Sequence, residues 1–321
     1  MKGMLDQKDA QSIDAAKLYY NSGFSQAEVA HHLGVSRPTV SKLLSHASAR
    51  GFVTISIADP REQSDELVGQ LRQRFALADV RVTTTPPGGS PLADLGSAGA
   101  ALLEELIEDG TSVGLSWGET MSAVASHLRR QPREGVEIVQ LKGGHSHTER
   151  STKDFYTLQA FAHAFNAEAH LLPLPGIFDS AEAKQWVERD RHIGQILHKG
   201  ASVSVAVFTV GSAEQESLAF NLGYLTAAEK QQIADNAVGD VCSRFFDARG
   251  EVACPAVDAR TVGISLADLA TRPTRVLVAG GASKARAIWV ALRKGLATHL
   301  VTDQATARKI VDWASEASHK C

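Results

Sequence analysis

The sequence predicts an α/β protein of two domains, in which a small all-α helix-turn-helix domain precedes a larger, mostly parallel, doubly wound α/β domain. Three observations support this prediction. The length of 321 residues suggests about two domains. The first sixty residues contain two short helical patterns around a glycine turn. From about residue 78 onward, β-branched runs alternate with helical stretches, which is typical of a sheet covered on both faces.

Composition narrows the class of protein. Hydrophobic residues make up 44% of the chain and charged residues 21%, as in an ordinary globular protein with ample core. The net charge of -3 excludes a bulk polycation, so any binding to nucleic acid must come from a local patch. The three cysteines are too few and too scattered for a disulfide framework or a zinc site. The N-terminus carries no apolar signal segment, and no apolar run approaches the roughly 20 residues that span a bilayer. We expect a reduced, cytoplasmic protein.

Residues 1–58 are predicted to form the helix-turn-helix domain. A first helical pattern covers residues 9–22 and stops at Gly23. Ser25 and Glu28 then have the spacing of a capping box at the start of a second, short helix. Its inward face is expected to carry small and apolar residues, Ala27, Ala30 and Leu33. Gly34 supplies the tight turn.

The third helix of this domain is predicted to be the one that contacts DNA. Ser36 caps it, and Pro38 lies in its first turn, where a missing N–H costs nothing. No Asp or Glu occurs from Val29 to Ala58, and short hydroxyl and basic side chains suit base edges and phosphates. The predicted DNA contacts are Ser25, Gln26, Ser36, Arg37, Pro38, Thr39, Ser41, Lys42 and His46. A helical hairpin with a solvated face, or a module that docks protein, is the weaker alternative.

Residues 59–77 are predicted to be a linker helix. Before it, residues 51–57 alternate as a short strand, which suggests a small wing, and Asp59-Pro60 breaks that pattern. Within the linker, Leu67, Leu71 and Phe75 form one apolar stripe. Such a stripe is either local core or part of a dimer contact.

Residues 78–321 are predicted to form a domain that binds a small effector. The predicted strands are 81–85 with its lead-in, 111–116, 136–141, 168–174, 202–210, 274–280 and 298–303. Helical patterns at 95–109, 118–130 and 283–295 lie between them. In such sheets, ligands bind beyond the carboxyl ends of the strands.

Two strand ends in this domain lead through glycine into a helix. The first is Ser116-Trp117-Gly118-Glu119-Thr120, and the second is Gly280-Gly281-Ala282-Ser283-Lys284. A helix N-terminus offers backbone N–H groups and a favourable dipole, so each loop is a candidate phosphate seat. Neither matches a Walker A or dinucleotide fingerprint, so neither a nucleoside triphosphate nor NAD is expected, and no cofactor is predicted.

A third strand end presents a lysine. Lys142 follows the strand at 136–141 and precedes Gly143 and Gly144. Lysine often closes a strand only because strands end in water. Beside two loops of the phosphate-seat type, however, Lys142 is better explained as a side chain that points into a ligand cleft.

Other polar residues are less informative. His145, His147, His163 and His170 cluster in sequence but lack the ligand spacing of a metal site, so no metal is predicted. Asp240 and Asp247 flank a strand, and either could accept ligand hydroxyls or serve a turn. Trp117 either covers the ligand or packs in the core, and Asp303 is expected to cap the helix that follows it.

Taken together, these segments resemble the SorC family of bacterial transcription regulators. The likeness covers nearly the whole chain and lies in the helix-turn-helix, GLSWGET, VQLKGGHS, FTVGS (208–212), VGDVCSRFFDARG (238–250), VAGGASKARAIWVALRKG and HLVTDQATA. The C-terminal half of that family resembles sugar-phosphate isomerases and glucosamine-phosphate deaminases. The resemblance implies a regulator, with repression expected, whose affinity for DNA changes when a phosphorylated sugar binds.

Within the family, a lysine followed by Gly-Gly resembles the deoxyribonucleoside-regulator branch, whose effector is deoxyribose 5-phosphate. We therefore hypothesise that Lys142 forms a Schiff base with the aldehyde of the open-chain sugar, which requires a neutral amine favoured by burial or a nearby cation. The alternative is that Lys142 only hydrogen-bonds the ligand. The expected effector contacts are Lys142, Ser116, Trp117, Gly118, Thr120, Gly143, Gly144, Gly211, Asp240, Gly280, Gly281 and Lys284.

The predicted function is that of a sequence-specific DNA-binding transcriptional regulator, not an enzyme. One alternative is a sugar-phosphate isomerase, aldolase or deaminase that carries an accessory DNA module, because a lysine imine could begin an aldol cleavage. Another is a regulator of the same family that senses a different sugar phosphate. Because helix-turn-helix proteins read two half-sites, at least a homodimer is expected, and the family resemblance adds a homotetramer as the alternative. The expected partners are operator DNA, the sugar phosphate and further copies of this chain.

Overall fold

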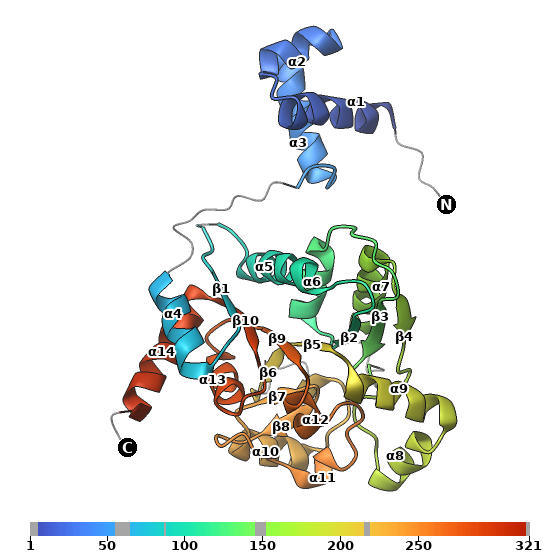
Figure 1. Ribbon diagram of the computed structural model, residues 1–321, viewed down its shortest axis with the longest axis vertical. Helices are drawn as coiled ribbons and strands as arrows, with labels where there is room; N and C mark the ends of the chain where they lie inside the picture. Colours follow the sequence, from blue (N-terminus) through green and yellow to red (C-terminus); the bar gives the residue numbers. More distant parts are fainter. Residues whose placement is uncertain (1–5, 55–64, 87, 145–151, 215–218, 319–321) are drawn as a thin grey trace. The chain divides into compact units, whose positions relative to one another are not determined.

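The computed structural model describes residues 6–54, 65–86, 88–144, 152–214 and 219–318 (Figure 1). The chain divides into two compact units, Met1–Asp59 and Pro60–Cys321, which are described separately below. None of the helices in these described ranges combines the length and the apolar character that a membrane-spanning segment needs.

The first unit is a small helical domain. Its helices are α1 (Gln7–Ala16), which continues as a π-helix (Lys17–Asn21), α2 (Gln26–Leu33) and α3 (Arg37–Ala49). Their buried residues form one cluster, Ala15, Ala16, Val29, Ala30, Val40, Leu43, Leu44 and Ala47. The expectation that Ala27 faces inward is wrong, because Ala27 is exposed and Val29 is fully buried. Val29, Ala30 and Leu33 have the helical spacing that points one face toward α3.

The predicted caps of α2 and α3 are present. Ser25 accepts a hydrogen bond from the Glu28 N–H while Glu28 accepts one from the Ser25 N–H, which confirms the capping box. Gly34 ends α2 with φ of 66°, a left-handed conformation in which glycine carries no Cβ penalty. Ser36 caps α3 by accepting from the Thr39 N–H. These contacts fix the turn between the two helices.

The segment after α3 differs in part from the sequence prediction. Residues 53 and 54 form no strand, and residues 55–57 of the predicted wing lie outside the described residues, as do 59–64 of the predicted linker. Helix α4 (Asp65–Phe75) packs against α14 and β1 of the second unit. Leu67 and Leu71 belong to the core of that unit, so the apolar stripe is local core.

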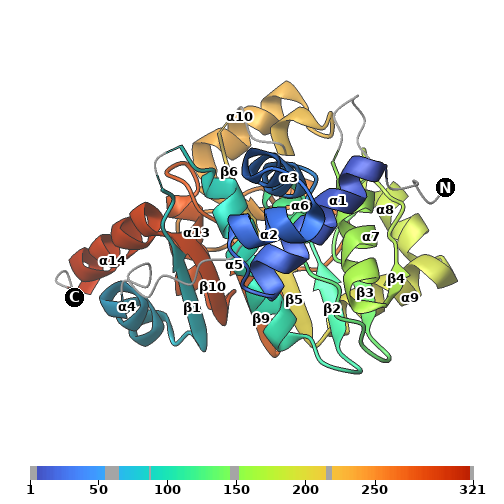
Figure 2. The same cartoon turned by 90° about the horizontal axis from the view of Figure 1, so that it is seen from above.

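A seven-stranded parallel sheet organises the second unit, and all seven predicted strands are confirmed with shorter ends. The strands are β1 (Asp79–Thr83), β2 (Ser112–Leu115), β3 (Glu137–Gln140), β4 (Glu168–His170), β5 (Val205–Phe208), β9 (Thr274–Val278) and β10 (His299–Asp303). Figure 2 shows them side by side in the order β1-β10-β9-β5-β2-β3-β4. Every neighbouring pair is parallel.

Helices cover both faces of this sheet, as the alternating sequence pattern predicts. One face packs under α5 (Pro91–Leu106), α6 (Glu119–His127) and α7 (Asp154–Phe165). The other packs under α4, α9 (Arg191–Ser202), α13 (Ala285–Arg293) and α14 (Gln304–Ser318) (Figure 1). Each face has its own buried apolar cluster, so the sheet is the middle layer of three.

A small antiparallel sheet was not predicted. It consists of β6 (Val210–Ser212), β7 (Gly239–Val241) and β8 (Arg244–Phe246). The remaining elements of the unit are α8 (Ala181–Glu188), a 3-10 turn (Ala219–Asn221), α10 (Ala227–Asn236), α11 (Pro255–Asp258) and α12 (Leu266–Ala270). The sequence run 202–210 was interpreted as one strand, but β5 ends at Phe208 and β6 begins at Val210 in a different sheet.

The chain reverses its direction of travel across the large sheet between β2 and β5. From β2 it proceeds outward through β3 to the edge strand β4, and from β5 it proceeds the other way through β9 to β10, which lies beside β1. The loops after β2 and β5 therefore lead in opposite directions, and in open α/β sheets ligands bind at the carboxyl ends of the strands at such a point. This topological switch point is where a ligand is expected.

Candidate functional site

Lys142 is a buried residue next to the switch point. It lies two residues after the last β2–β3 pair, Leu115–Gln140, and only 8% of it is exposed. A β-bridge to Gly263 fixes its backbone. Its Nζ lies 3.8 Å from the centroid of the Trp117 ring. The Trp117 ring is itself held by a 3.1 Å hydrogen bond from Nε1 to the Gly143 carbonyl. Lys142 is therefore no solvated strand end, and Trp117 covers its amine.

The two glycines after Lys142 permit close packing. An ideal Cβ on Gly143 would lie 2.2 Å from the Pro175 carbonyl oxygen, and one on Gly144 would lie 1.9 Å from Asp154 Oδ2. Neither glycine has a positive φ. Glycine at both positions therefore permits the close approach of neighbouring segments.

Asp240 is a buried carboxylate influenced by two lysines. Its Oδ2 accepts a 3.0 Å hydrogen bond from the Ser243 N–H. It pairs in register with Gly211, and an ideal Cβ there would lie 2.0 Å from Asp240 Oδ1. Burial raises the pKa of Asp240, while the charges of Lys142 and Lys284 and the Ser243 hydrogen bond oppose that rise. Asp240 therefore lies against Gly211 and within range of the charges of both lysines.

A strained turn holds Asp240 in place. Cys242 and Ser243, between β7 and β8, have φ of 52° and 65°. Two consecutive left-handed residues make the two-residue hairpin turn in which glycine or asparagine is usual. Here the turn aims the Ser243 N–H at the carboxylate. Burial raises the pKa of the neighbouring Cys242 thiol to about 11, and the Lys142 charge opposes that rise.

Lys284 lies in the wall of an open cavity of about 540 Å³. Its Nζ donates to Thr120 Oγ1 at 3.4 Å. Burial lowers the pKa of Lys284, and the charges of Asp240 and Glu119 oppose that change. The cavity extends from Thr120 and Gly280 to the ends of β1 and β10, where Thr83 and Asp303 line it.

The two glycine loops differ in the donors that they leave free. Helix α6 has no side-chain cap at Gly118, and the buried Ser116 Oγ just before it has no hydrogen-bond partner. In the other loop, the Gly281 N–H donates to Asp303 Oδ2 at 2.7 Å and to Thr306 Oγ1 at 3.0 Å. The start of α6, beside Lys284, is therefore the better anion seat.

Asp303 has the capping role that the sequence predicted. Its Oδ1 accepts from the Thr306 N–H at 2.9 Å at the start of α14. The sequence reasoning missed the threonines of the cavity, Thr83, Thr84 and Thr85, which follow β1. The sequence pattern that could have indicated them is the run of three consecutive hydroxyl residues at the end of a predicted strand.

The predicted DNA contacts lie along the turn and the outer face of α3. Arg37, Pro38, Ser41 and Lys42 are exposed, and Thr39 is half-buried. The hydroxyl groups of Ser25 and Ser36 accept the capping hydrogen bonds of α2 and α3, while Gln26 is the first residue of α2.

His46 and Arg50 are engaged within the domain. His46 Nε2 lies 2.8 Å from Asp9 Oδ1, and Arg50 Nη2 donates to Asp9 Oδ2 at 2.9 Å. Hydrogen bonds from Arg50 and then His46 hold the pKa of Asp9 below its usual value. The positive charge of Arg50 is therefore balanced by a buried carboxylate from α1.

Two further polar clusters were considered as sites. Glu137, Glu168 and His170 offer three ligand atoms within 4.8 Å of one another. However, Lys199 Nζ contacts Glu137 and lies 3.3 Å from His170 Nε2. The Lys199 ammonium group therefore occupies the position next to these ligand atoms and neutralises the Glu137 carboxylate. Of the predicted non-ligating histidines, His145 and His147 lie outside the described residues.

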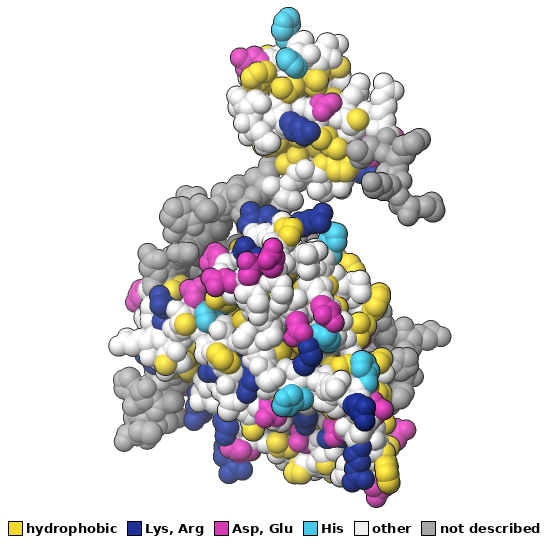
Figure 3. All heavy atoms as spheres, turned by 45° about the vertical axis from the view of Figure 1, so that its right-hand side comes forward, with side chains coloured by type: hydrophobic (Ala, Val, Ile, Leu, Met, Phe, Trp, Pro, Cys, Tyr) yellow, Lys and Arg dark blue, Asp and Glu magenta, His cyan; other side chains and the backbone are white. Residues whose placement is uncertain are grey.

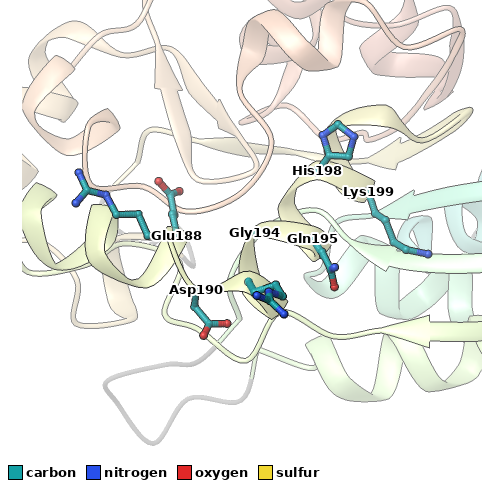
Figure 4. Close-up of a pocket in the computed structure, with 8 residues that line it drawn as sticks. Glu188, Asp190, Gly194, Gln195, His198 and Lys199 are labelled. Carbon is teal, nitrogen blue, oxygen red and sulfur yellow. The ribbon is translucent and has the colours of Figure 1, made fainter.

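The second cluster lines a cavity of about 650 Å³ where α8 meets α9 (Figure 4). Glu188 pairs with Lys184 at 3.3 Å, and Asp190 caps α9 by accepting from the His192 N–H. Arg189 stacks on the exposed Trp186 ring. Arg189, Asp190 and Arg191 are exposed. Acidic and basic side chains are likewise interspersed over the face drawn in Figure 3.

Comparisons with known proteins agree with this architecture. The family model described as "Putative sugar-binding domain" matches residues 59–312. The chain is 43% identical to the deoxyribonucleoside regulator of Bacillus subtilis over 308 residues, covering 95% of this chain and 98% of the relative. It is 30% identical to the sorbitol operon regulator of Klebsiella pneumoniae, covering 93% and 96% of the two chains.

The solved structures include a full-length neighbour. The crystal structure of the sorbitol operon regulator SorC from Klebsiella pneumoniae aligns with a TM-score of 0.77 at 27% identity, covering 95% of this chain and 99% of that one. The matched family model and both relatives extend over nearly all of the second unit, including the β2–β5 crevice and its lysines. The chain belongs to the SorC family of sugar-binding transcriptional regulators.

Proposed function

We propose that this chain is a sequence-specific DNA-binding transcriptional regulator whose affinity for DNA is set by a phosphorylated sugar bound at the β2–β5 switch point. The observation that carries the proposal is the pair of lysines at two different strand ends, Lys142 buried against the Trp117 ring and Lys284 in contact with Thr120 at the start of α6. Beside them, the uncapped start of α6 and the unpaired Ser116 Oγ offer donors for an anion. A ligand with a phosphate at one end and a carbonyl at the other matches that distribution of groups.

Deoxyribose 5-phosphate is the effector that we propose. The relative that is 43% identical over 95% of this chain is named a deoxyribonucleoside regulator, and a deoxyribose phosphate has both required ends. The phosphate binds at the start of α6 with Lys284, and the open-chain aldehyde meets Lys142. The amine condenses with the aldehyde to a Schiff base, and the Trp117 ring covers the resulting cation.

The first unit is proposed to read DNA as a helix-turn-helix. Helix α3 enters the major groove with Arg37, Ser41 and Lys42, which are exposed on one helix. Two half-sites require two copies of the chain, so a homodimer or a homotetramer is the proposed assembly. We propose repression that is relieved when the effector binds, which requires unequal effector affinity for the DNA-competent and DNA-incompetent states.

Calorimetry and mass spectrometry test the effector. Deoxyribose 5-phosphate should bind and raise the melting temperature, since a ligand that binds only the native state stabilises it. Sodium borohydride should then fix a mass adduct on the peptide that contains Lys142. A panel of other sugar phosphates is the control. Binding of another sugar phosphate in preference would reassign the effector, and no binding by any of them would refute the sensing role.

An enzymatic role is the second candidate, because an imine-forming lysine beside a carboxylate is also what an aldolase requires. Incubation of the protein with deoxyribose 5-phosphate and assay for a released aldehyde separates the two. We expect stoichiometric binding without turnover. Sustained product formation would favour the enzyme.

A further inference from the structure

Within the proposed function, on which this inference rests, we propose that Arg244 is a positioning residue for the covalent step at Lys142. Arg244 holds a short segment, residues 261–264, against the backbone of Lys142. That contact fixes the lysine with its amine on the Trp117 ring, where the aldehyde of the sugar meets it. Arg244 acts through the segment and contributes no atom to the reaction.

The segment 261–264 lies against the chain at Lys142. Gly263 forms an antiparallel β-bridge with Lys142, and the Ile264 N–H donates to the Leu141 carbonyl at 2.8 Å. An ideal Cβ on Gly263 would lie 2.7 Å from the Lys142 Cα and 2.1 Å from the Leu141 carbonyl oxygen, so this approach requires glycine. The segment therefore sets the position of the Lys142 backbone beyond the last β2–β3 pair.

Arg244 supplies hydrogen bonds that hold this segment, which lies between α11 and α12 and belongs to neither helix. Its Nε donates to the Ile264 carbonyl at 2.7 Å. Its Nη2 donates to the carbonyls of Gly263 at 2.9 Å and Thr261 at 3.3 Å. Its Nη1 donates to the Asp258 carboxylate at 2.8 Å and to the Asp258 carbonyl at 3.3 Å.

These contacts use the whole guanidinium group of Arg244. Its five acceptors match the five N–H donors of an arginine, one on Nε and two on each Nη. The side chain is also buried, with 7% of it exposed. Arg244 is therefore committed to the segment and to Asp258, and a direct contact with the ligand is not its role.

The backbone position of Lys142 decides where its amine lies. The Lys142 carbonyl accepts from Gln140 Nε2 at 3.0 Å, and the next carbonyl, that of Gly143, accepts from Trp117 Nε1 at 3.1 Å. The Trp117 ring and the Lys142 amine are therefore both tied to the same two residues of backbone. A displacement of this backbone moves the amine, and a misplacement of about 1 Å at a reacting atom can slow a reaction by about 100-fold.

The step that depends on this geometry is the addition of the Lys142 amine to the aldehyde carbon. The C–N bond forms, the aldehyde C–O bond breaks, and the products are the imine and one water. The water takes its oxygen from the aldehyde and its two hydrogens from the neutral amine. The phosphate end of the ligand is assigned to Lys284 and Thr120 at the start of α6, so its binding does not depend on the segment 261–264.

A purely structural role for Arg244 predicts different behaviour. Loss of the buried guanidinium leaves the Asp258 carboxylate and the segment's carbonyls unpaired, which destabilises the fold whatever the ligand. At a temperature well below melting, that loss of stability alone would not change the reaction of the folded protein. The positioning role predicts slower imine formation with unchanged non-covalent binding.

The experiment uses the full chain and two ligands. One is deoxyribose 5-phosphate, and the other is its alcohol, deoxyribitol 5-phosphate, which has no aldehyde and cannot form an imine. Calorimetry gives the affinity of the alcohol. Rapid mixing followed by borohydride quench at timed intervals gives the rate of adduct formation with saturating aldehyde. Thermal melting gives the stability of each variant.

The principal variant is Arg244→Lys, which keeps the charge but has too few donors and the wrong geometry for the five acceptors. Arg260→Lys is the matched control. Arg260 is also buried, but its guanidinium pairs with Glu229 and donates to the carbonyls of Phe178 and Tyr224, outside the segment. The two variants make the same chemical change at two buried arginines and differ in whether the segment is released.

We expect Arg244→Lys to form the adduct on the order of 100-fold more slowly while binding the alcohol as the wild type does. Arg260→Lys should also melt at a lower temperature but keep the wild-type adduct rate. A milder variant, Asp258→Asn, removes the charged anchor of Nη1 and keeps the three carbonyl contacts. It should slow the adduct by about tenfold, and it decides the question if Arg244→Lys does not fold.

Four results would overturn the inference. A wild-type adduct rate in folded Arg244→Lys, or in Asp258→Asn where only that variant folds, removes the positioning role. Equal slowing in Arg260→Lys assigns the effect to general stability. Weaker binding of the alcohol in folded Arg244→Lys assigns Arg244 to the architecture of the whole site. Binding without any adduct in the wild type rejects the imine, and with it this role, while the sensing of a sugar phosphate survives.

Discussion

The two surfaces on which we place ligands differ in how their side chains are held. On α3, Arg37, Ser41 and Lys42 are exposed on a helix whose opposite face is its core. At the switch point, Lys142, Trp117 and Asp240 are buried and influence one another. Exposed residues that share no contacts act additively, whereas coupled buried ones do not. The α3 surface is therefore expected to tolerate single changes without loss of structure, and the switch-point site is not.

The largest expected effect is at Lys142. Lys142→Met should abolish the borohydride adduct completely, because Lys142 supplies the amine that lies on the Trp117 ring in the described part of the chain. The measurement is the mass of the intact protein after reduction. Lys284→Met is the matched control and should keep the adduct at saturating ligand. An adduct that moves to Lys284, or that persists in Lys142→Met, would show that the two lysines were assigned the wrong way round.

The next effect is on operator affinity. Arg37→Ala and Lys42→Ala should each weaken DNA binding by about tenfold and leave effector affinity unchanged, since both side chains are exposed. Gel-shift titration at fixed salt measures this, and the two changes should add in the double variant. Ser45→Ala, whose hydroxyl donates to the Ser41 carbonyl, is a control of little expected effect. Unchanged affinity in both variants would remove α3 from the groove.

A smaller, pH-dependent effect is expected at Lys284. Because burial lowers the pKa of Lys284, this lysine loses its charge at a lower pH than an ordinary lysine. Affinity for the phosphate ligand should therefore fall as pH rises through that lowered pKa, and Lys284→Met should be weaker by about tenfold at neutral pH and lack the decline. Calorimetry with deoxyribitol 5-phosphate between neutral and alkaline pH checks both. The same decline in the variant would assign it to another group.

The smallest effect is a gain in stability. The pKa of Asp240 is raised in the folded state above its ordinary value of 3.8, so folded protein binds that proton more tightly than unfolded protein. Stability is then lost as pH rises through that window, and the ionised carboxylate destabilises the fold at neutral pH. Asp240→Asn should raise the melting temperature by about 2–4 °C at neutral pH, and the gain should shrink in acid. A lower melting temperature at neutral pH would contradict this.

Much of the fold could be predicted because its signals are local. Strand runs such as 274–280 are β-branched and buried on both faces, and the caps at Ser25 and Ser36 depend on residues three positions away. The small sheet was not predicted because β6 and β7 have three residues each. A strand of that length is too short to show an alternating hydrophobic pattern. The partners of His46 and Arg50 also escaped it, because Asp9 lies 37 and 41 residues away in the chain.

The sequence by itself determined the seven parallel strands, the capped helices and the lysine and glycines at the strand ends, because hydrophobic period and capping act over a few residues. Only the tertiary structure decided what those strand-end residues face. It placed the Lys142 amine against the Trp117 ring and buried Asp240 where the charges of both lysines act on it. It also paired the Gly281 N–H with Asp303, while the start of α6 has no side-chain cap. The reason is that burial and charge depend on segments that are distant in the chain and meet only when the sheet closes.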